Sequence, residues 1–286
     1  MSEPAHPAPA QPEGMPVCPR HPDRESWVRC QRCGRPVCPQ CQRQAPVGVQ
    51  CVDCVREGAR TVRSARTAFG ATMRGTGAPI TKVLVGICVA VWLLELARPS
   101  IIDDFAFGPV VGWSEPWTVL TGAFLHAAPS PLHLGMNMLV LWTFGNALEP
   151  ALGRTRFLLT YLVSAVGGAV AIVLLATPPD HVLLGRTSDF APYLSWFQGT
   201  IGASGAIFGL FGAYMVINKG LGNSNSSMWV TLLLNAVIGF SISGISWQGH
   251  LGGLITGAAC GAVLMLTRDP ARRRLAVPGL LAVLVV

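Results

Sequence analysis

The chain has 286 residues, of which 51% are hydrophobic and 12% charged, with a net charge of +7 and a mean hydropathy of +0.47. Soluble globular domains carry about 25% charged residues, so this composition excludes an ordinary soluble protein. It also excludes a disordered chain, which requires low hydrophobicity and high charge. The class that remains is an integral membrane protein.

Positive charge and cysteine are concentrated near the N-terminus. Residues 1–82 carry 12 Lys/Arg against 6 Asp/Glu, whereas residues 83–286 carry 9 against 8. Of the nine cysteines, only Cys88 and Cys260 fall in the apolar part. The chain therefore divides into a small basic part and a membrane part. Because no apolar run of signal-peptide length opens the chain, we expect its N-terminus in the cytosol.

Eight potential metal ligands in the basic part form four pairs, each with two residues between its members. The pairs are Cys18 and His21, Cys30 and Cys33, Cys38 and Cys41, and Cys51 and Cys54. This is the ligand number of two tetrahedral zinc sites. We expect the pairs to interleave, the first and third sharing one structural zinc ion and the second and fourth the other. Disulfides are the alternative, but a reducing cytosol and a histidine within the first pair favour metal.

The segment from Cys18 to Cys54 resembles B-box and related cross-brace zinc fingers. A domain of this size has little core, so zinc would supply much of its folding free energy. Because protein ligands fill every position, no catalytic role is expected for the metal. The resemblance implies a structural module that docks a cytosolic protein partner.

Six apolar stretches approach the ~20 residues that a helix needs to cross a membrane. They are 80–97, 132–148, 157–176, 200–217, 228–243 and 245–266. A seventh stretch, 275–286, has 12 residues and is expected to be a partial span. The predicted fold class is an all-α polytopic membrane protein with a six-helix core and a partial seventh helix, preceded by a small zinc-binding domain. The predicted parts are a disordered Pro/Ala-rich tail (1–16), the zinc finger (17–56), a basic juxtamembrane linker (57–78), the transmembrane core (79–267) and a basic loop with the partial span (268–286).

The distribution of Lys and Arg sets the expected orientation. If the zinc finger is cytoplasmic, the inner segments hold 13 Lys/Arg and the outer segments hold two, Arg98 and Arg186. The inner segments are 56–82, 149–156, 218–227 and 267–274. This bias predicts a multi-pass protein of the plasma (cytoplasmic) membrane with a cytoplasmic N-terminus. The basic linker could be read as a nucleic-acid binder, but its place before an apolar span favours anionic lipid of the bilayer, and no nucleic-acid partner is expected.

Polar side chains within apolar spans are costly in lipid and therefore informative. His133, Ser204 and His250 each lie within roughly five residues of the expected outer end of a span, at one depth. A serine nucleophile needs a base, usually histidine, so Ser204 and His250 are a candidate pair. No Asp or Glu is expected at this depth, which favours a Ser-His dyad over a triad. His133 and Asn137 share a helical face and are expected to support an oxyanion beside the Ser204 N–H.

Small residues recur every four positions on two spans, a pattern that lets helices approach closely. They are Gly205, Gly209 and Ala213 on one span and Gly253, Gly257 and Gly261 on the other. Close approach would bring Ser204 to His250, with Phe208 packed against the imidazole ring. The alternative is that these residues only pack helices.

Three motifs in this order resemble those of rhomboid intramembrane serine proteases. Along the chain, the matching residues are His133 and Asn137 (HxxxN), then Gly202-Ala203-Ser204-Gly205 (GxSG), then His250, Gly253 and Gly257 of the last core helix. The resemblance covers roughly 79–266. It departs at Thr118, which follows Trp117 where the family usually has arginine, and it matches Glu149 to a structural acidic position.

The resemblance implies an intramembrane serine endopeptidase with Ser204 as nucleophile and His250 as general base. The residues implied to support the oxyanion or the site are His133, Asn137, Gly202 and Phe208. Substrates would be single-span transmembrane proteins, cleaved near the outer membrane face by a site that opens to that side. No catalytic cofactor is expected.

Two other functions remain open. The first is a catalytically silent rhomboid-like membrane chaperone or adaptor that uses the zinc finger as a docking module. Such a protein would normally lack the nucleophile or the base, and both are present. The second is a transporter with a zinc-sensing head, which predicts charged residues along a midplane path, and the second to sixth spans offer none.

Overall fold

The computed structural model describes residues 14–61, 65–72, 77–126, 129, 131–179, 194–241 and 246–285. Most of the tail expected over 1–16 lies outside these residues. The chain divides into two compact units, Met1–Ser64 and Ala65–Val286. Each unit is built from a different kind of structure.

The N-terminal unit consists of two small hairpins and one helix. Strands β1 (Val17–Cys18) and β2 (His21–Glu25) pair antiparallel, as do β3 (Gln42–Gln44) and β4 (Val49–Cys51). The single-turn helix η1 (Pro39–Cys41) precedes β3, and α1 (Val52–Thr61) follows β4 directly. Its buried apolar residues are mostly the cysteines themselves, so the unit has very little conventional core.

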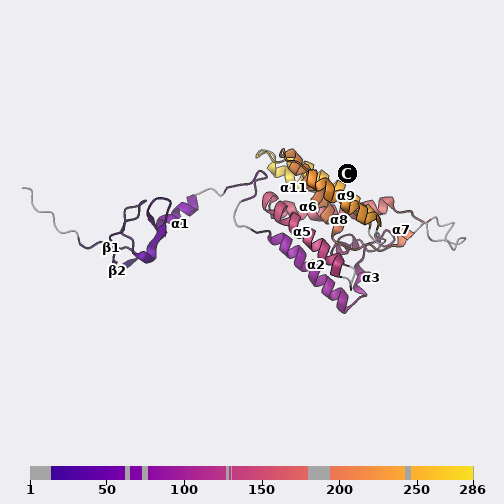
Figure 1. Ribbon diagram of the computed structural model, residues 1–286, viewed down its shortest axis with the longest axis horizontal. Helices are drawn as coiled ribbons and strands as arrows, with labels where there is room; N and C mark the ends of the chain where they lie inside the picture. The colour runs from indigo at the N-terminus through magenta and orange to yellow at the C-terminus, as the bar shows by residue number, and fades with distance from the viewer. Residues whose placement is uncertain are drawn as a thin grey trace, which may run out of the picture. The chain divides into compact units, whose positions relative to one another are not determined.

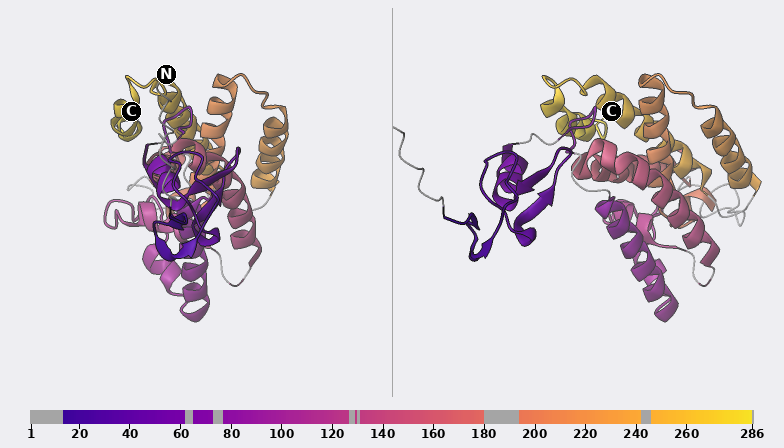
Figure 2. Two further views of the ribbon diagram at one scale, coloured as in Figure 1. Left: turned by 90° about the vertical axis from the view of Figure 1, so that its left-hand side faces the viewer. Right: turned by 60° about the vertical axis from the view of Figure 1, so that its left-hand side comes forward.

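The second unit is a bundle of helices (Figure 1). The helices are α2 (Pro79–Ala97), α3 (Ile101–Phe105), α4 (Thr118–Thr121), α5 (Pro131–Leu152), α6 (Arg154–Leu175), α7 (Leu194–Phe197), α8 (Ser204–Gly220), α9 (Ser226–Ser241), α10 (Trp247–Leu266) and α11 (Ala276–Ala282). The 3-10 turns η2 (Gly122–Phe124) and η4 (Arg273–Leu275) precede α5 and α11. Helix α10 packs against α8 and α6 at the centre, and α9 lies at one edge of the bundle in both views of Figure 2.

Within the described residues, three helices are long and apolar enough to cross a membrane, namely α2, α6 and α10. Helix α5 has 22 residues but carries polar side chains, and α8 and α9 are shorter, with 17 and 16 residues. These helices coincide with the six stretches expected from the sequence. The bundle is therefore that of an all-α, polytopic membrane protein.

Three of the expected boundaries differ from the structure by four residues or more. The stretch predicted over 132–148 continues to Leu152 in α5. The stretch predicted over 200–217 becomes helical only at Ser204, because Gly202 has a φ of +121°, outside the helical region. The stretch 275–286 contains only the seven-residue helix α11, whose Ala276 and Leu280 are buried in the core shared with α6 and α10.

A buried carboxylate links α5 to the start of α2. Glu149, in the last turn of α5, accepts hydrogen bonds from the backbone N–H of Ile80 (2.9 Å) and of Thr81 (2.8 Å). It also accepts one from the Thr81 hydroxyl, at 2.8 Å. The first N–H groups of a helix have no partner within the helix, so Glu149 caps α2 from a neighbouring element. The structural role expected for Glu149 is therefore confirmed.

Candidate active site and metal centres

Three polar residues lie in the first turns of three helices. His133 is the third residue of α5, Ser204 the first of α8 and His250 the fourth of α10. The Ser246 hydroxyl caps α10 by accepting from the Gly249 N–H at 3.3 Å, which fixes the turn that carries His250. The helix starts thus hold all three residues.

Helices α8 and α10 run in the same direction and approach very closely. A Cβ atom built on Gly253 would lie 1.9 Å from the carbonyl oxygen of Gly205, and one on Gly257 would lie 1.9 Å from that of Gly209. Further along both helices, Gly261 faces Ala213. Any side chain would force the helices apart, so the predicted small-residue faces are confirmed as the contact between them.

The contact expected between Phe208 and His250 is present. Their rings stack with centroids 4.2 Å apart and an interplanar angle of 10°. Phe208 lies one turn after Ser204, so the imidazole lies against the turn that carries the serine. Both side chains are described, and no hydrogen bond joins Ser204 to His250. Catalytic hydrogen bonds often form or tighten only when substrate binds.

Gly202 lies between His133 and Ser204. A Cβ built on it would lie 2.9 Å from His133 Nε2 and 3.8 Å from Ser204 Oγ. Both its φ of +121° and this lack of space require glycine. Asn137 is buried, and its Nδ2 donates to the His133 carbonyl oxygen at 2.9 Å, which directs the amide group toward the first turn of α5.

The loop between α2 and α5 is folded around the segment that leads to Ser204. Phe107 and Thr200 exchange backbone hydrogen bonds, with Phe107 N–H donating at 3.2 Å and Thr200 N–H at 2.6 Å. Gly202 N–H donates to the Gly122 carbonyl at 2.9 Å. Thr118, at the position that departs from the rhomboid pattern, is buried and its hydroxyl donates to the Glu115 carbonyl at 2.6 Å.

The expectation that no acidic residue lies near this level is wrong. Glu95, in the last turn of α2, is 0% exposed, and its Oε1 accepts the backbone N–H of the equally buried His126 at 2.8 Å. The His126 ring lies 5.2 Å from that of His133, between ring centroids. Glu95 lies in the first span, and its sequence neighbours carry no sign that the folded chain brings it beside His126. Glu95 and His126 border the His133 side of the site.

The eight metal-ligand candidates form two clusters in the N-terminal unit. One contains Cys18, His21, Cys38 and Cys41, and the other contains Cys30, Cys33, Cys51 and Cys54. Within each cluster the ligand atoms all lie within 4.8 Å of one another. The predicted interleaving of first with third and second with fourth pairs is therefore confirmed.

The distances within the clusters fit a tetrahedral metal ion. With Zn–S bonds of about 2.3 Å, two sulfurs of one site are about 3.8 Å apart. The Sγ atoms of Cys33 and Cys51 are 3.8 Å apart. His21 Nδ1 lies 3.3 Å from the sulfur of Cys38 and 3.4 Å from that of Cys41. These donor sets, three sulfurs with one nitrogen and four sulfurs, are those of structural zinc sites.

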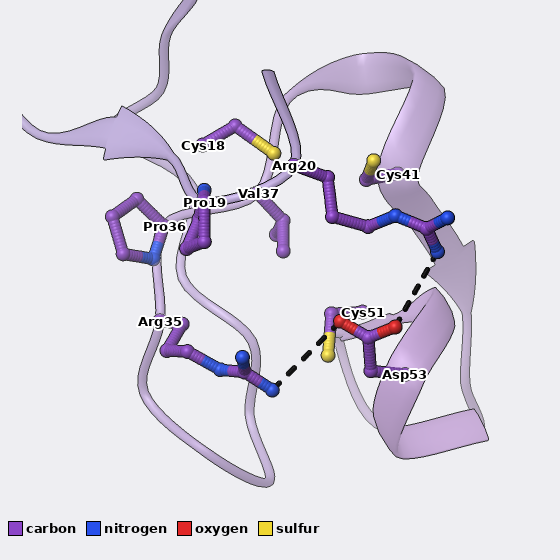
Figure 3. Close-up of a pocket in the computed structure, with 9 residues that line it drawn as sticks. All are labelled: Cys18, Pro19, Arg20, Arg35, Pro36, Val37, Cys41, Cys51 and Asp53. Atoms are coloured by element: carbon purple, nitrogen blue, oxygen red, sulfur yellow. Dashed lines mark hydrogen bonds and ion pairs between the residues drawn. The ribbon is translucent and has the colours of Figure 1, made fainter. Parts of the chain in front are cut away.

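At Cys18 and Cys33 the surroundings favour thiolate, the form that binds metal. Burial instead raises the pKa of Cys41 to about 11, and the neighbouring Cys51 raises the pKa of Cys54 to about 12. Burial opposes ionisation of the Cys18 thiol, but the backbone N–H groups of Cys38 and Arg20 outweigh it and lower its pKa to about 6. Asp53 lies between Arg20 and Arg35 and pairs with both, at 3.3 and 3.9 Å (Figure 3). Arg35 also donates to Cys33 at 3.4 Å, which lowers the pKa of that thiol.

The fold and these residues define a class, a helical multi-pass membrane protein with a polar site at the starts of three core helices. Comparison with known families narrows it. Residues 113–267 match the rhomboid domain. The chain belongs to the rhomboid family.

Named relatives match between 62% and 69% of this chain. The chain is 34% identical over 188 residues to the rhomboid protease GluP of Bacillus subtilis. The match covers 62% of this chain and 33% of GluP. It is 32% identical over 197 residues to YdcA of the same organism, covering 65% of this chain and 86% of YdcA. It is 26% identical over 213 residues to the rhomboid protease GlpG of Salmonella paratyphi A. That match covers 69% of this chain and 67% of GlpG. The chain thus spans only a third of GluP.

Proposed function

We propose that the protein is an intramembrane serine endopeptidase in which Ser204 attacks a peptide carbonyl and His250 accepts its proton. In the first step His250 passes the proton to the departing amine, and the acyl-enzyme forms. In the second step water hydrolyses the acyl-enzyme. Substrates are single-span transmembrane proteins cleaved near the outer face of the plasma membrane, with the N-terminal unit in the cytoplasm.

One observation carries the proposal: the first turns of α5, α8 and α10 hold His133, Ser204 and His250. The stacked Phe208 and the glycine contact between α8 and α10 support a close approach of base to nucleophile.

Two groups of donors are available for the oxyanion. Ser204 and Gly205 contribute backbone N–H groups at a helix start, where they have no partner within the helix and where the helix dipole favours negative charge. His133 Nε2 reaches the same place beside Gly202, supported by Asn137. Removing one donor of this kind typically costs about 100-fold to 1,000-fold in kcat.

The experiment is cleavage of a reporter transmembrane substrate by the full-length protein in membranes. Ser204→Ala and His250→Ala should each abolish cleavage. Ser114→Ala, an exposed outer-loop serine, is the matched control and should leave it unchanged. Cleavage that persists in Ser204→Ala would contradict the proposal, and an uncleaved reporter with a folded wild-type protein would favour the silent adaptor.

For the N-terminal unit we propose two structural zinc ions, held by the clusters described above, and a docking role toward a cytosolic protein or substrate tail. The ligand geometry supports the metal. The docking role has its own test: deletion of residues 1–56 should change substrate choice or stability while the core keeps its chemistry. Loss of activity toward every substrate would argue instead that the unit is needed to fold the core.

A further inference from the structure

Arginines gather where α6 begins and where α10 is joined to α11. They are Arg154, Arg156, Arg268, Arg272, Arg273 and Arg274. Among the described residues, none of the six forms an ion pair with a carboxylate; the ion pairs lie in the N-terminal unit and, for Arg98 with Asp104, in the outer loop. Asp269 lies in the same segment, but its Oδ1 accepts the Ala271 N–H at 2.9 Å and, within the described part of the chain, it forms no ion pair with the six arginines. Such an excess of positive over negative charge is unfavourable unless a further anion joins it.

Two of these arginines are half-buried and meet on one short stretch of backbone. Arg156 Nη1 donates to the Phe69 carbonyl, and its Nη2 donates to the Arg273 carbonyl at 3.4 Å. Arg273 Nη2 donates to the Ala68 carbonyl at 3.3 Å. The two guanidinium groups are therefore neighbours, and each has more N–H groups than these carbonyls use.

The stretch that receives them, residues 65–72, is itself fixed to the bundle. We call it the 65–72 hook. The side chain of Phe69 is 2% exposed and belongs to the membrane unit's core. Thr67 Oγ1 donates to the Ala151 carbonyl at the end of α5, at 2.7 Å. Gly70, with a φ of +82°, lies against the Arg273 side chain. The arginine pair thus has a defined geometry rather than being a set of mobile surface charges.

We propose that Arg156 and Arg273, with the exposed Arg272 and Arg274 beside them, bind the phosphate of an anionic phospholipid headgroup. The arginines adjoin the ends of the apolar helices α6 and α10, both long enough to cross a membrane, so they lie at a membrane boundary. Phosphate matches the fork of a guanidinium group, which favours arginine over lysine at such a site. Basic pockets between helix ends are suited to anionic headgroups.

A lipid rather than a soluble anion is the occupant that this position favours. Helix α11 lies beside α6 and α10, so apolar helix surface borders the arginines (Figure 1). A lipid bound there adds acyl-chain contact to the phosphate contact, and a free phosphate does not. The bound headgroup holds the 65–72 hook against the bundle. This proposal does not rest on proteolytic activity.

The experiment compares full-length protein in neutral phosphatidylcholine micelles with and without phosphatidylglycerol. Wild-type protein should retain phosphatidylglycerol in native mass spectrometry and melt at a higher temperature with it. The double variant Arg156→Gln with Arg273→Gln should retain about one tenth of that phosphatidylglycerol or less. Lys219→Gln, which removes a cation at the end of α8, is the matched control and should retain the wild-type amount.

Three outcomes overturn the proposal. Equal retention by the double variant and the Lys219→Gln control would show only a general attraction to positive charge. Equal stabilisation by soluble glycerol phosphate at the same concentration would indicate a soluble-anion site. If the double variant fails to fold, a second variant, Arg272→Gln with Arg274→Gln, tests the proposal. Because these exposed side chains should also be needed for full retention of phosphatidylglycerol, unchanged retention in this variant contradicts the proposal.

Discussion

Phe208 of α8 stacks on His250 of α10 with ring centroids 4.2 Å apart and ring planes within 10°. The contact links the helix that carries the candidate nucleophile to the imidazole that would serve as its base. A planar partner restricts rotation of the imidazole about its side-chain bonds. We therefore assign Phe208 a positioning role in the proposed dyad.

Phe208→Leu tests this role. An aromatic pair contributes about 0.5–1.5 kcal/mol, and misplacement of a catalytic group by 1 Å can cost about 100-fold in rate. We expect kcat to fall about tenfold to 100-fold with a smaller change in KM, and Phe208→Tyr to restore most of the loss. The matched control is Phe211→Leu, on the same helix but packed on Phe144. If both leucine variants lower kcat equally, the effect is one of general packing.

Gly257→Ala tests the contact between α8 and α10. The added Cβ would meet the Gly209 carbonyl at 1.9 Å, so the helices must separate, at a cost of about 1–3 kcal/mol for overpacking. We expect a lower midpoint of thermal unfolding and reduced cleavage. Gly135→Ala, on α5, has no atom within 4 Å of its added Cβ and should leave the midpoint unchanged or higher. Unchanged stability in Gly257→Ala would contradict the close approach.

Glu95→Ala tests the acidic group beside the site. The substitution leaves the His126 N–H buried without this acceptor, which costs about 1–3 kcal/mol. We expect lower thermal stability and, because His126 adjoins His133, lower kcat. Glu95→Gln keeps an oxygen that can accept the same bond and should be close to wild type. Equal losses in the two variants would show that the negative charge, not the hydrogen bond, matters.

Zinc content tests the two metal centres. Purified full-length protein should contain two zinc ions per chain, because the structure has two complete ligand sets. Cys38→Ala and Cys33→Ala should each lower the content to one, each through a different cluster. Cys88→Ala, in the membrane unit, should keep both ions. A protein without zinc, or loss of both ions from either single variant, would contradict two independent sites.

Much of the fold follows from local pattern. Apolar length predicted the positions of the membrane helices, and the x2 spacing of the cysteine pairs predicted their interleaving. The four-residue spacing of Gly253 and Gly257 predicted the α8–α10 contact, because residues four apart share a helical face. Once α8 and α10 pack closely, the contact between Phe208 and His250 follows.

What the sequence could not supply are contacts between residues distant in the chain. Pairing of Phe107 with Thr200 and the bond from His126 to Glu95 join segments whose patterns carry no sign of each other. The start of α8 at Ser204 follows the positive φ of Gly202, and the nearby His133 ring leaves no room for a Cβ at that glycine. The 65–72 hook looked like part of a featureless basic linker, because only the folded bundle shows where Phe69 is buried.

Covalent labelling by a fluorophosphonate probe tests the central claim most directly, since the probe reacts with an activated serine. The full-length protein in detergent should gain the probe's mass on the peptide that contains Ser204, and His250→Ala should abolish the adduct while Ser114→Ala retains it. An adduct on another residue, no adduct on folded protein, or labelling of Ser204 that persists in His250→Ala would contradict a Ser204–His250 dyad.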